Sequence, residues 1–91
     1  MGSVIKNNNA SNNRDGIYLL FSSNNSLSNN NVSNNGDGID LYFSSSNKIY
    51  LNNFINNTNN TFSYDSINLW NSTEKITYTY KGNQYTNYLG N

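Results

Sequence analysis

The sequence predicts an all-β fold, a parallel β-helix of about three 22-residue rungs with a C-terminal β-hairpin cap. Three observations carry this prediction. The sequence repeats with a period of 22, apolar and polar residues alternate within each repeat, and the 91 residues include 24 Asn and 13 Ser. The length is that of one compact domain, so the repeats are expected to stack into a single solenoid.

The repeat is strongest in the first two copies. When residues 5–26 are aligned with residues 27–48, 14 of the 22 pairs are identical. A third copy starts at Ile49, and we expect an insert near residues 58–63 before Asp65 restores the register of Asp37. Ordered repetition argues against the disorder that an Asn- and Ser-rich composition otherwise suggests. We therefore expect rungs at 4–26, 27–48 and 49–73, together spanning residues 1–73.

Short strands within each rung are predicted by a period of two, as in Ile17, Leu19 and Phe21. Parallel stacking at a spacing of roughly 4.8 Å aligns equivalent residues into columns, and the inward columns form the core. Asn tolerates left-handed backbone at sharp corners and can hydrogen-bond to an Asn one rung away. Gly16 and Gly38 are expected to supply backbone freedom before the longest strands. The expected inward columns are Ile5/Leu27/Ile49, Asn7/Asn29/Leu51, Ala10/Val32/Phe54, Ile17/Ile39/Ile67 and Leu19/Leu41/Leu69, and the expected corner ladders are Asn8/Asn30/Asn52 and Asn9/Asn31/Asn53.

Residues 74–91 are predicted to form a Tyr-rich hairpin that turns at Lys81-Gly82-Asn83. The open end of a β-helix exposes unpaired backbone and apolar columns, so this hairpin is expected to cap it. The N-terminal end has no comparable segment. We therefore expect that end to meet either preceding rungs or a second copy, in end-to-end self-association.

Composition excludes several classes of function. Five basic and five acidic residues give no electrostatic basis for a nucleic-acid partner. The chain lacks Cys and His, so it offers no disulfide, zinc site, imidazole base or thiol nucleophile. No stretch of 18 apolar residues predicts membrane insertion, and no signal peptide is found in this chain.

Acidic residues form one predicted column, Asp15, Asp37 and Asp65, at the entrance to the longest strand. Each Asp can accept backbone hydrogen bonds in an Asp-Gly turn, which is the simplest interpretation. Two alternatives stay open: a Ca²⁺ ion shared by the column, and a glycosidase pair of Asp37 with Asp40 or Asp65. No other cofactor is expected.

Outward positions of the same strand predict a carbohydrate-binding strip, in which sugars stack on aromatic rings and hydrogen-bond to polar neighbours. The alternative is that Trp70 and Tyr42 pack under the insert or the C-terminal tail. The candidate residues are Tyr18, Asp40, Tyr42, Asn68 and Trp70.

The run NNGDGIDLYFSSSNKIYLNNF at 34–54 resembles the repeats of the NosD-like family, also called carbohydrate-binding and sugar-hydrolysis repeats. The segments NSTEKITYTY at 71–80 and YTNYLGN at 85–91 are similar to the ends of such arrays in surface proteins of methanogenic archaea. The resemblance implies a right-handed β-helix and an extracellular or cell-surface location. Its members include structural proteins, polysaccharide-degrading enzymes and a copper-delivery protein. Copper delivery fits poorly here, because copper sites use His, Cys or Met and the chain has one Met, at position 1.

These observations favour a non-catalytic β-helix segment of an extracellular or cell-surface protein, serving as scaffold or polysaccharide-binding module. The alternatives are a fragment of a carbohydrate-acting enzyme and a structural module that stacks end to end. The expected partners are a polysaccharide and adjacent β-helix rungs.

Overall fold

The computed structural model describes residues 2–72 and 75–91, and in this part all regular structure is β-strand. The all-β prediction is therefore confirmed. The predicted boundary between the rungs and the hairpin, at residues 73 and 74, lies outside the described residues. The strands are β1 (Val4–Lys6), β2 (Asn9–Ser11), β3 (Asp15–Leu20), β4 (Ser26–Ser28), β5 (Asn31–Ser33), β6 (Asp37–Tyr42), β7 (Lys48–Tyr50), β8 (Asn53–Ile55), β9 (Asn59–Tyr64), β10 (Ile76–Tyr80) and β11 (Asn83–Asn87).

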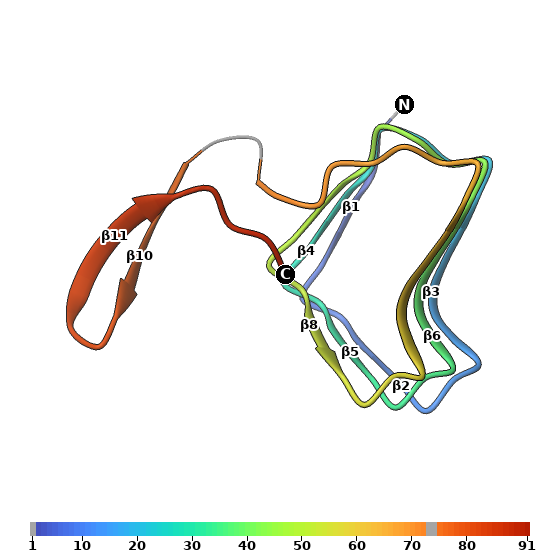
Figure 1. The fold of residues 1–91 in the computed structure, drawn as a ribbon, viewed down its shortest axis with the longest axis horizontal. Coiled ribbons are helices and arrows are strands. Elements are labelled where there is room, and N and C mark those ends of the chain that lie inside the picture. Colours follow the sequence, from blue (N-terminus) through green and yellow to red (C-terminus); the bar gives the residue numbers. More distant parts are fainter. Residues whose placement is uncertain (1, 73–74) are drawn as a thin grey trace.

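Three parallel sheets form the walls of a β-helix, with the strand orders β1-β4-β7, β2-β5-β8 and β3-β6-β9. Each rung supplies one strand to each sheet, and Figure 1 shows the rungs superimposed around a three-sided cross-section. The offset between paired strands is 22 residues throughout, as in Ile5 opposite Leu27 and Leu27 opposite Ile49. The predicted β-helix of about three rungs is confirmed. Among the described residues, no helix has the length and hydrophobicity needed to cross a membrane.

The core lies along the axis of the middle rung, because that rung has a neighbour on both sides. Four apolar side chains of this rung are fully buried, namely Leu27, Val32, Ile39 and Leu41, and Ile49 at the start of the third rung is fully buried beside Leu27. Each of them lies in one of the predicted inward columns. The column of Asn7, Asn29 and Leu51 is the exception, because all three have positive φ and form a corner instead.

At each corner a residue with left-handed backbone precedes a residue whose side chain hydrogen-bonds to the next rung; this second residue is Asn at three corners and Ser at the corner of Phe21, Phe43 and Asp65. Asn29 has a φ of 55°, and the next residue, Asn30, donates from its backbone N–H and its side-chain amide to Oδ1 of Asn52. Asn8 donates in the same way to Asn30. The predicted corner ladder of Asn9, Asn31 and Asn53 is wrong, because these residues begin the strands β2, β5 and β8. Asn25, Asn47 and Asn68 form a second such ladder, and Asn13, Asn35 and Asn57 form a third, which the sequence interpretation did not identify.

Gly16 and Gly38 have a different role from the one expected, since neither has a positive φ. A Cβ atom on Gly16 would lie 2.6 Å from the Gly38 carbonyl oxygen and 2.8 Å from Cγ1 of Val32. The backbone at this position approaches its neighbours too closely for any side chain. Glycine is therefore required here for space rather than for conformational freedom.

The third rung has no insert, so the expected loop near residues 58–63 is wrong. That segment is β9, which pairs with β6 at the same offset of 22 and places Asn59 opposite Asp37 and Tyr64 opposite Tyr42. Thr61 and Ser63 occupy the columns in which Ile67 and Leu69 were expected. Asp65 instead lies at a corner, with a φ of 48° that matches those of Phe21 and Phe43.

A fourth rung begins at Asn68 and is interrupted by the hairpin. Leu69 forms a parallel bridge with Lys48, and Trp70 packs against the core. Ser72 and Leu89 hydrogen-bond to each other on either side of the hairpin, and Asn91 then accepts from the backbone N–H and side-chain amide of Asn52. Figure 1 shows β10 and β11 extending to the side of the solenoid rather than across its end. Trp70, rather than the hairpin, therefore covers the adjacent core column.

Candidate functional site

The outer face of the β3-β6-β9 sheet gathers the chemically distinctive side chains of the molecule. This sheet has the longest strands, six residues each, and its outward positions carry carboxyl groups and aromatic rings. Inward Leu19 and Leu41 hold the strands on the core, so the outward side chains stand on a fixed support.

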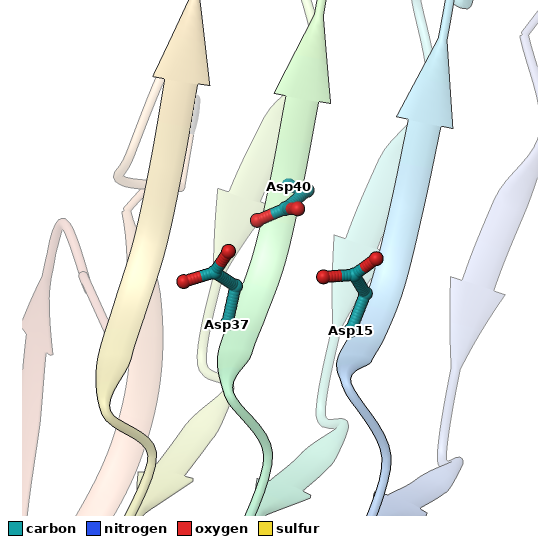
Figure 2. Close-up of side chains that lie close together, drawn as sticks. All are labelled: Asp15, Asp37 and Asp40. Atoms are coloured by element: carbon teal, nitrogen blue, oxygen red, sulfur yellow. The ribbon is translucent and has the colours of Figure 1, made fainter.

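Three carboxyl groups, those of Asp15, Asp37 and Asp40, converge on this face. Figure 2 shows Asp15 on β3 and Asp37 and Asp40 on β6, with the three side chains close together on one face of the sheet. One carboxylate oxygen of each lies within 4.8 Å of the others. Asn59 of β9, which occupies the third position of the Asp15–Asp37 column, donates from its amide to Oδ1 of Asp37 at 2.9 Å.

Asp40 is the most unusual member of this acidic trio. Its side chain is only 3% exposed, and its Oδ1 atom has no hydrogen-bond partner in the described structure. Burial, and after it hydrogen bonding to and charge repulsion from the carboxyl groups of Asp15 and Asp37, together raise the pKa of the Asp40 carboxyl to about 7. Burial and the nearby Asp40 also raise the pKa of the Tyr42 phenol.

An aromatic strip adjoins the acidic trio and runs across all three rungs. Tyr18 and Phe62 are the register partners of Asp40 on the neighbouring strands, and both rings lie within 5.6 Å of the Tyr42 ring. The contacts continue from Tyr42 to Tyr64, from Tyr64 to Phe43 and from Phe43 to Phe21, at centroid distances of 5.1–6.0 Å. We define the aromatic strip as Tyr18, Phe21, Tyr42, Phe43, Phe62 and Tyr64.

The strip remains largely accessible despite these contacts. Five of its six rings are between 41% and 73% exposed, and only Tyr42 is half-buried. Rings that served packing alone would be covered by other elements, as Trp70 is in part. The described residues enclose no cleft at this face, so any ligand would lie on an open surface.

The structure brings together only some of the residues that were predicted to form sites. Tyr18, Asp40 and Tyr42 lie together, as do Asp15 and Asp37. Asp65 lies at a corner outside the acidic trio, Asn68 belongs to an inward ladder, and Trp70 packs against the core. All three corrections have one cause, which is that the third rung continues at an offset of 22.

The residues that sequence reasoning missed follow from the same register. Phe62 and Tyr64 take the outward positions that were assigned to Asn68 and Trp70, and Asn59 takes the position assigned to Asp65. A constant offset of 22 applied beyond residue 58 would have found them. Phe21 and Phe43 were treated as strand residues, but positive φ turns them outward at the corner.

The fold and this face together define a class of protein: a parallel β-helix that displays acidic and aromatic side chains on one open wall. The model of the periplasmic copper-binding protein (NosD) family matches residues 1–91, the whole chain. The chain therefore belongs to the NosD family. No curated protein and no solved structure gave a match.

Copper, which the family description names, does not suit the donors in these 91 residues. Copper sites are built from imidazole, thiolate and thioether groups, and the chain contains no His, no Cys and a single Met. The acidic trio instead offers carboxylate oxygens, which are hard ligands. The described site and the copper of the family description therefore do not correspond.

Proposed function

We propose that this chain is a polysaccharide-binding segment of a β-helix protein that works outside the cytoplasm, at the cell surface or in the periplasm. The observation that carries the proposal is the aromatic strip, six rings in unbroken contact of which five are at least 41% exposed. The location follows the family, which is described as periplasmic. The β-helix serves as the scaffold that spaces the rings.

Sugar recognition suits this surface chemically. The C–H faces of a pyranose ring carry partial positive charge and pack on the electron-rich faces of aromatic rings. Hydroxyl groups at the edge of the sugar can donate to the carboxylates of Asp15 and Asp37 and accept from the amide of Asn59. Because the strip crosses three rungs without a wall at either end, it favours a chain of sugars over a single monosaccharide.

Tyr64 offers a direct test, because its ring joins the two halves of the strip through Tyr42 and Phe43. We expect Tyr64→Ala to reduce retention on the insoluble or immobilised polysaccharides that the wild type binds by roughly tenfold, equivalent to about 1.4 kcal/mol. Affinity electrophoresis or pull-down across a panel of neutral and acidic polysaccharides measures this retention. A thermal melt of each variant shows whether the fold is kept.

Tyr88→Ala is the matched control. Tyr88 has the same exposed fraction as Tyr64, 54%, but follows the hairpin and lies outside the strip. Equal losses in the two variants, or failure of the wild type to bind any glycan in the panel, would count against the proposal. A reducing-sugar assay on the bound glycans is run in parallel, since release of reducing ends would identify a carbohydrate-acting enzyme instead.

End-to-end stacking of copies is a second candidate, favoured by the state of β9. All six residues of β9 are exposed, and β9 is an edge strand that pairs with β6 alone, while β3 is the opposite edge. Pairing of β9 of one copy with β3 of the next would continue the sheet. Sedimentation velocity over a hundredfold concentration range should then show growing oligomers, and a constant monomer would contradict stacking.

A further inference from the structure

The acidic trio has a geometry that polysaccharide binding does not require. We propose that Asp15, Asp37 and Asp40 bind one divalent cation of the size of Ca²⁺ on the outer face of β3 and β6. This proposal goes beyond polysaccharide binding and does not depend on it, because the cation needs no sugar to occupy the site.

The first argument is the unsatisfied oxygen of Asp40. This side chain is 97% buried, it is directed into the trio, and its Oδ1 atom has no hydrogen-bond donor in the described structure. A buried carboxylate oxygen without a donor carries a cost of several kcal/mol in other proteins, and native structures rarely leave one without a reason. A cation between the three groups would supply the missing partner.

The second argument is the surroundings of Asp40. Its register partners across the sheet are the aromatic residues Tyr18 and Phe62, which supply no cationic group. The charged groups that face it are Asp15 and Asp37, and both are acidic. Three carboxylates held this close repel one another unless a proton or a cation intervenes.

The third argument is size. Ca²⁺ binds oxygen at 2.3–2.6 Å, so two oxygens on opposite sides of it lie about 4.6–5.2 Å apart. The ligand oxygens of the trio lie within 4.8 Å of one another, which this span accommodates without movement of the strands. Mg²⁺ binds at about 2.0–2.1 Å and would draw the oxygens to within about 4.2 Å.

The remaining ligands can come from solvent. Ca²⁺ takes six to eight oxygens, and Asp15 and Asp37 are both half-buried, so the site is reachable from outside. The hydrogen bond from the amide of Asn59 fixes the carboxylate of Asp37 from the third rung. Three carboxylates on a rigid but open surface correspond to an affinity of about 0.1–1 mM, as in other extracellular calcium modules.

Calcium titration of the complete chain tests the proposal without any glycan. At about pH 8, roughly a unit above the pKa of Asp40, isothermal titration should show one Ca²⁺ bound per chain. Near 5 mM, about ten times the expected dissociation constant, calcium should raise the melting temperature by roughly 5–10 °C over chelator-treated protein. Mg²⁺ at the same concentration and NaCl at the same ionic strength should produce clearly smaller shifts.

Three variants decide whether the trio is responsible. Asp40→Asn and Asp37→Asn should abolish both the heat of binding and the calcium-dependent shift. Asp65→Asn makes the same chemical change at an exposed corner outside the trio and should keep the full response. A wild type that neither releases heat nor shifts its melting temperature overturns the proposal, as does an Asp40→Asn variant that responds like the wild type. These experiments contain no sugar, so neither result affects the outcome of the polysaccharide-binding test.

Discussion

Asp40 occupies a column in which both neighbouring rungs have an aromatic residue, Tyr18 on one side and Phe62 on the other. These rings remove water from the carboxyl group, and Asp15 and Asp37 add negative charge beside it. A single residue therefore links the acidic trio to the aromatic strip. We therefore expect the protonation state of Asp40 to affect both the acidic trio and the aromatic strip.

The raised pKa of Asp40 predicts that stability falls as pH rises. In the unfolded chain the Asp40 carboxyl has its ordinary pKa of 3.8, whereas in the folded chain its pKa is about 7. Between these values the folded state binds more protons, so the free energy of unfolding decreases through this window and levels above it. Without calcium, the full loss is on the order of 2–4 kcal/mol.

Asp40→Asn should remove this pH dependence, because the amide has the same shape and no proton to lose. Chemical denaturation without divalent cations should show little difference from the wild type near the ordinary pKa of 3.8 and a more stable variant at about pH 8. The groups that face Asp40, namely Asp15, Asp37, Tyr18 and Tyr42, are unchanged in the variant. A wild type whose stability is flat or rises from pH 4 to pH 8 would show that Asp40 titrates normally.

At the scale of strands and corners, polar ladders determine the register. The segment from Asp65 to Trp70 matches the segment from Asp37 to Tyr42 in pattern, which is why a six-residue insert is a reasonable prediction from the sequence. At an offset of 22, however, Asn57 accepts from Asn35 and Ser66 accepts from Ser44. These are three hydrogen bonds to partly buried groups, each worth about 1 kcal/mol net and more if left unpaired. In this register Ile67 and Leu69 stay exposed.

The same corners explain what the sequence could and could not predict. The repetition predicted the solenoid, the apolar columns of two rungs and the Asn8/Asn30/Asn52 ladder. It also predicted five residues on the outer face of the β3-β6-β9 sheet. It did not distinguish the two Asn of a corner pair such as Asn34-Asn35, in which the first takes the left-handed backbone and the second points inward. Phe62, Tyr64 and Asn59 were not predicted, because the apolar residues Ile67 and Leu69 suggest a different register for the third rung from the one that the hydrogen bonds set.

At the scale of the whole molecule, the chain is a solenoid with one insertion. Ser72 and Leu89 lie on either side of the hairpin in the sequence and hydrogen-bond to each other in the fourth rung. The strands β10 and β11 make their contacts chiefly with one another. The fourth rung then resumes, because Gly90 accepts a hydrogen bond from the backbone of Leu51 and Asn91 extends the ladder of Asn52.

This arrangement predicts that the hairpin is dispensable for folding. Replacing residues 73–88 with Asn-Gly, a two-residue turn that suits adjacent antiparallel residues, should keep the β-sheet circular dichroism spectrum. The melting temperature should change by less than roughly 5 °C, because the Ser72–Leu89 pair and Asn91 keep their positions on the third rung. In the same background, Trp70→Ala serves as the destabilising control and should cost about 2 kcal/mol, since Trp70 packs against the core. A shortened chain that does not fold would instead show that the hairpin, and not the fourth rung, completes the solenoid.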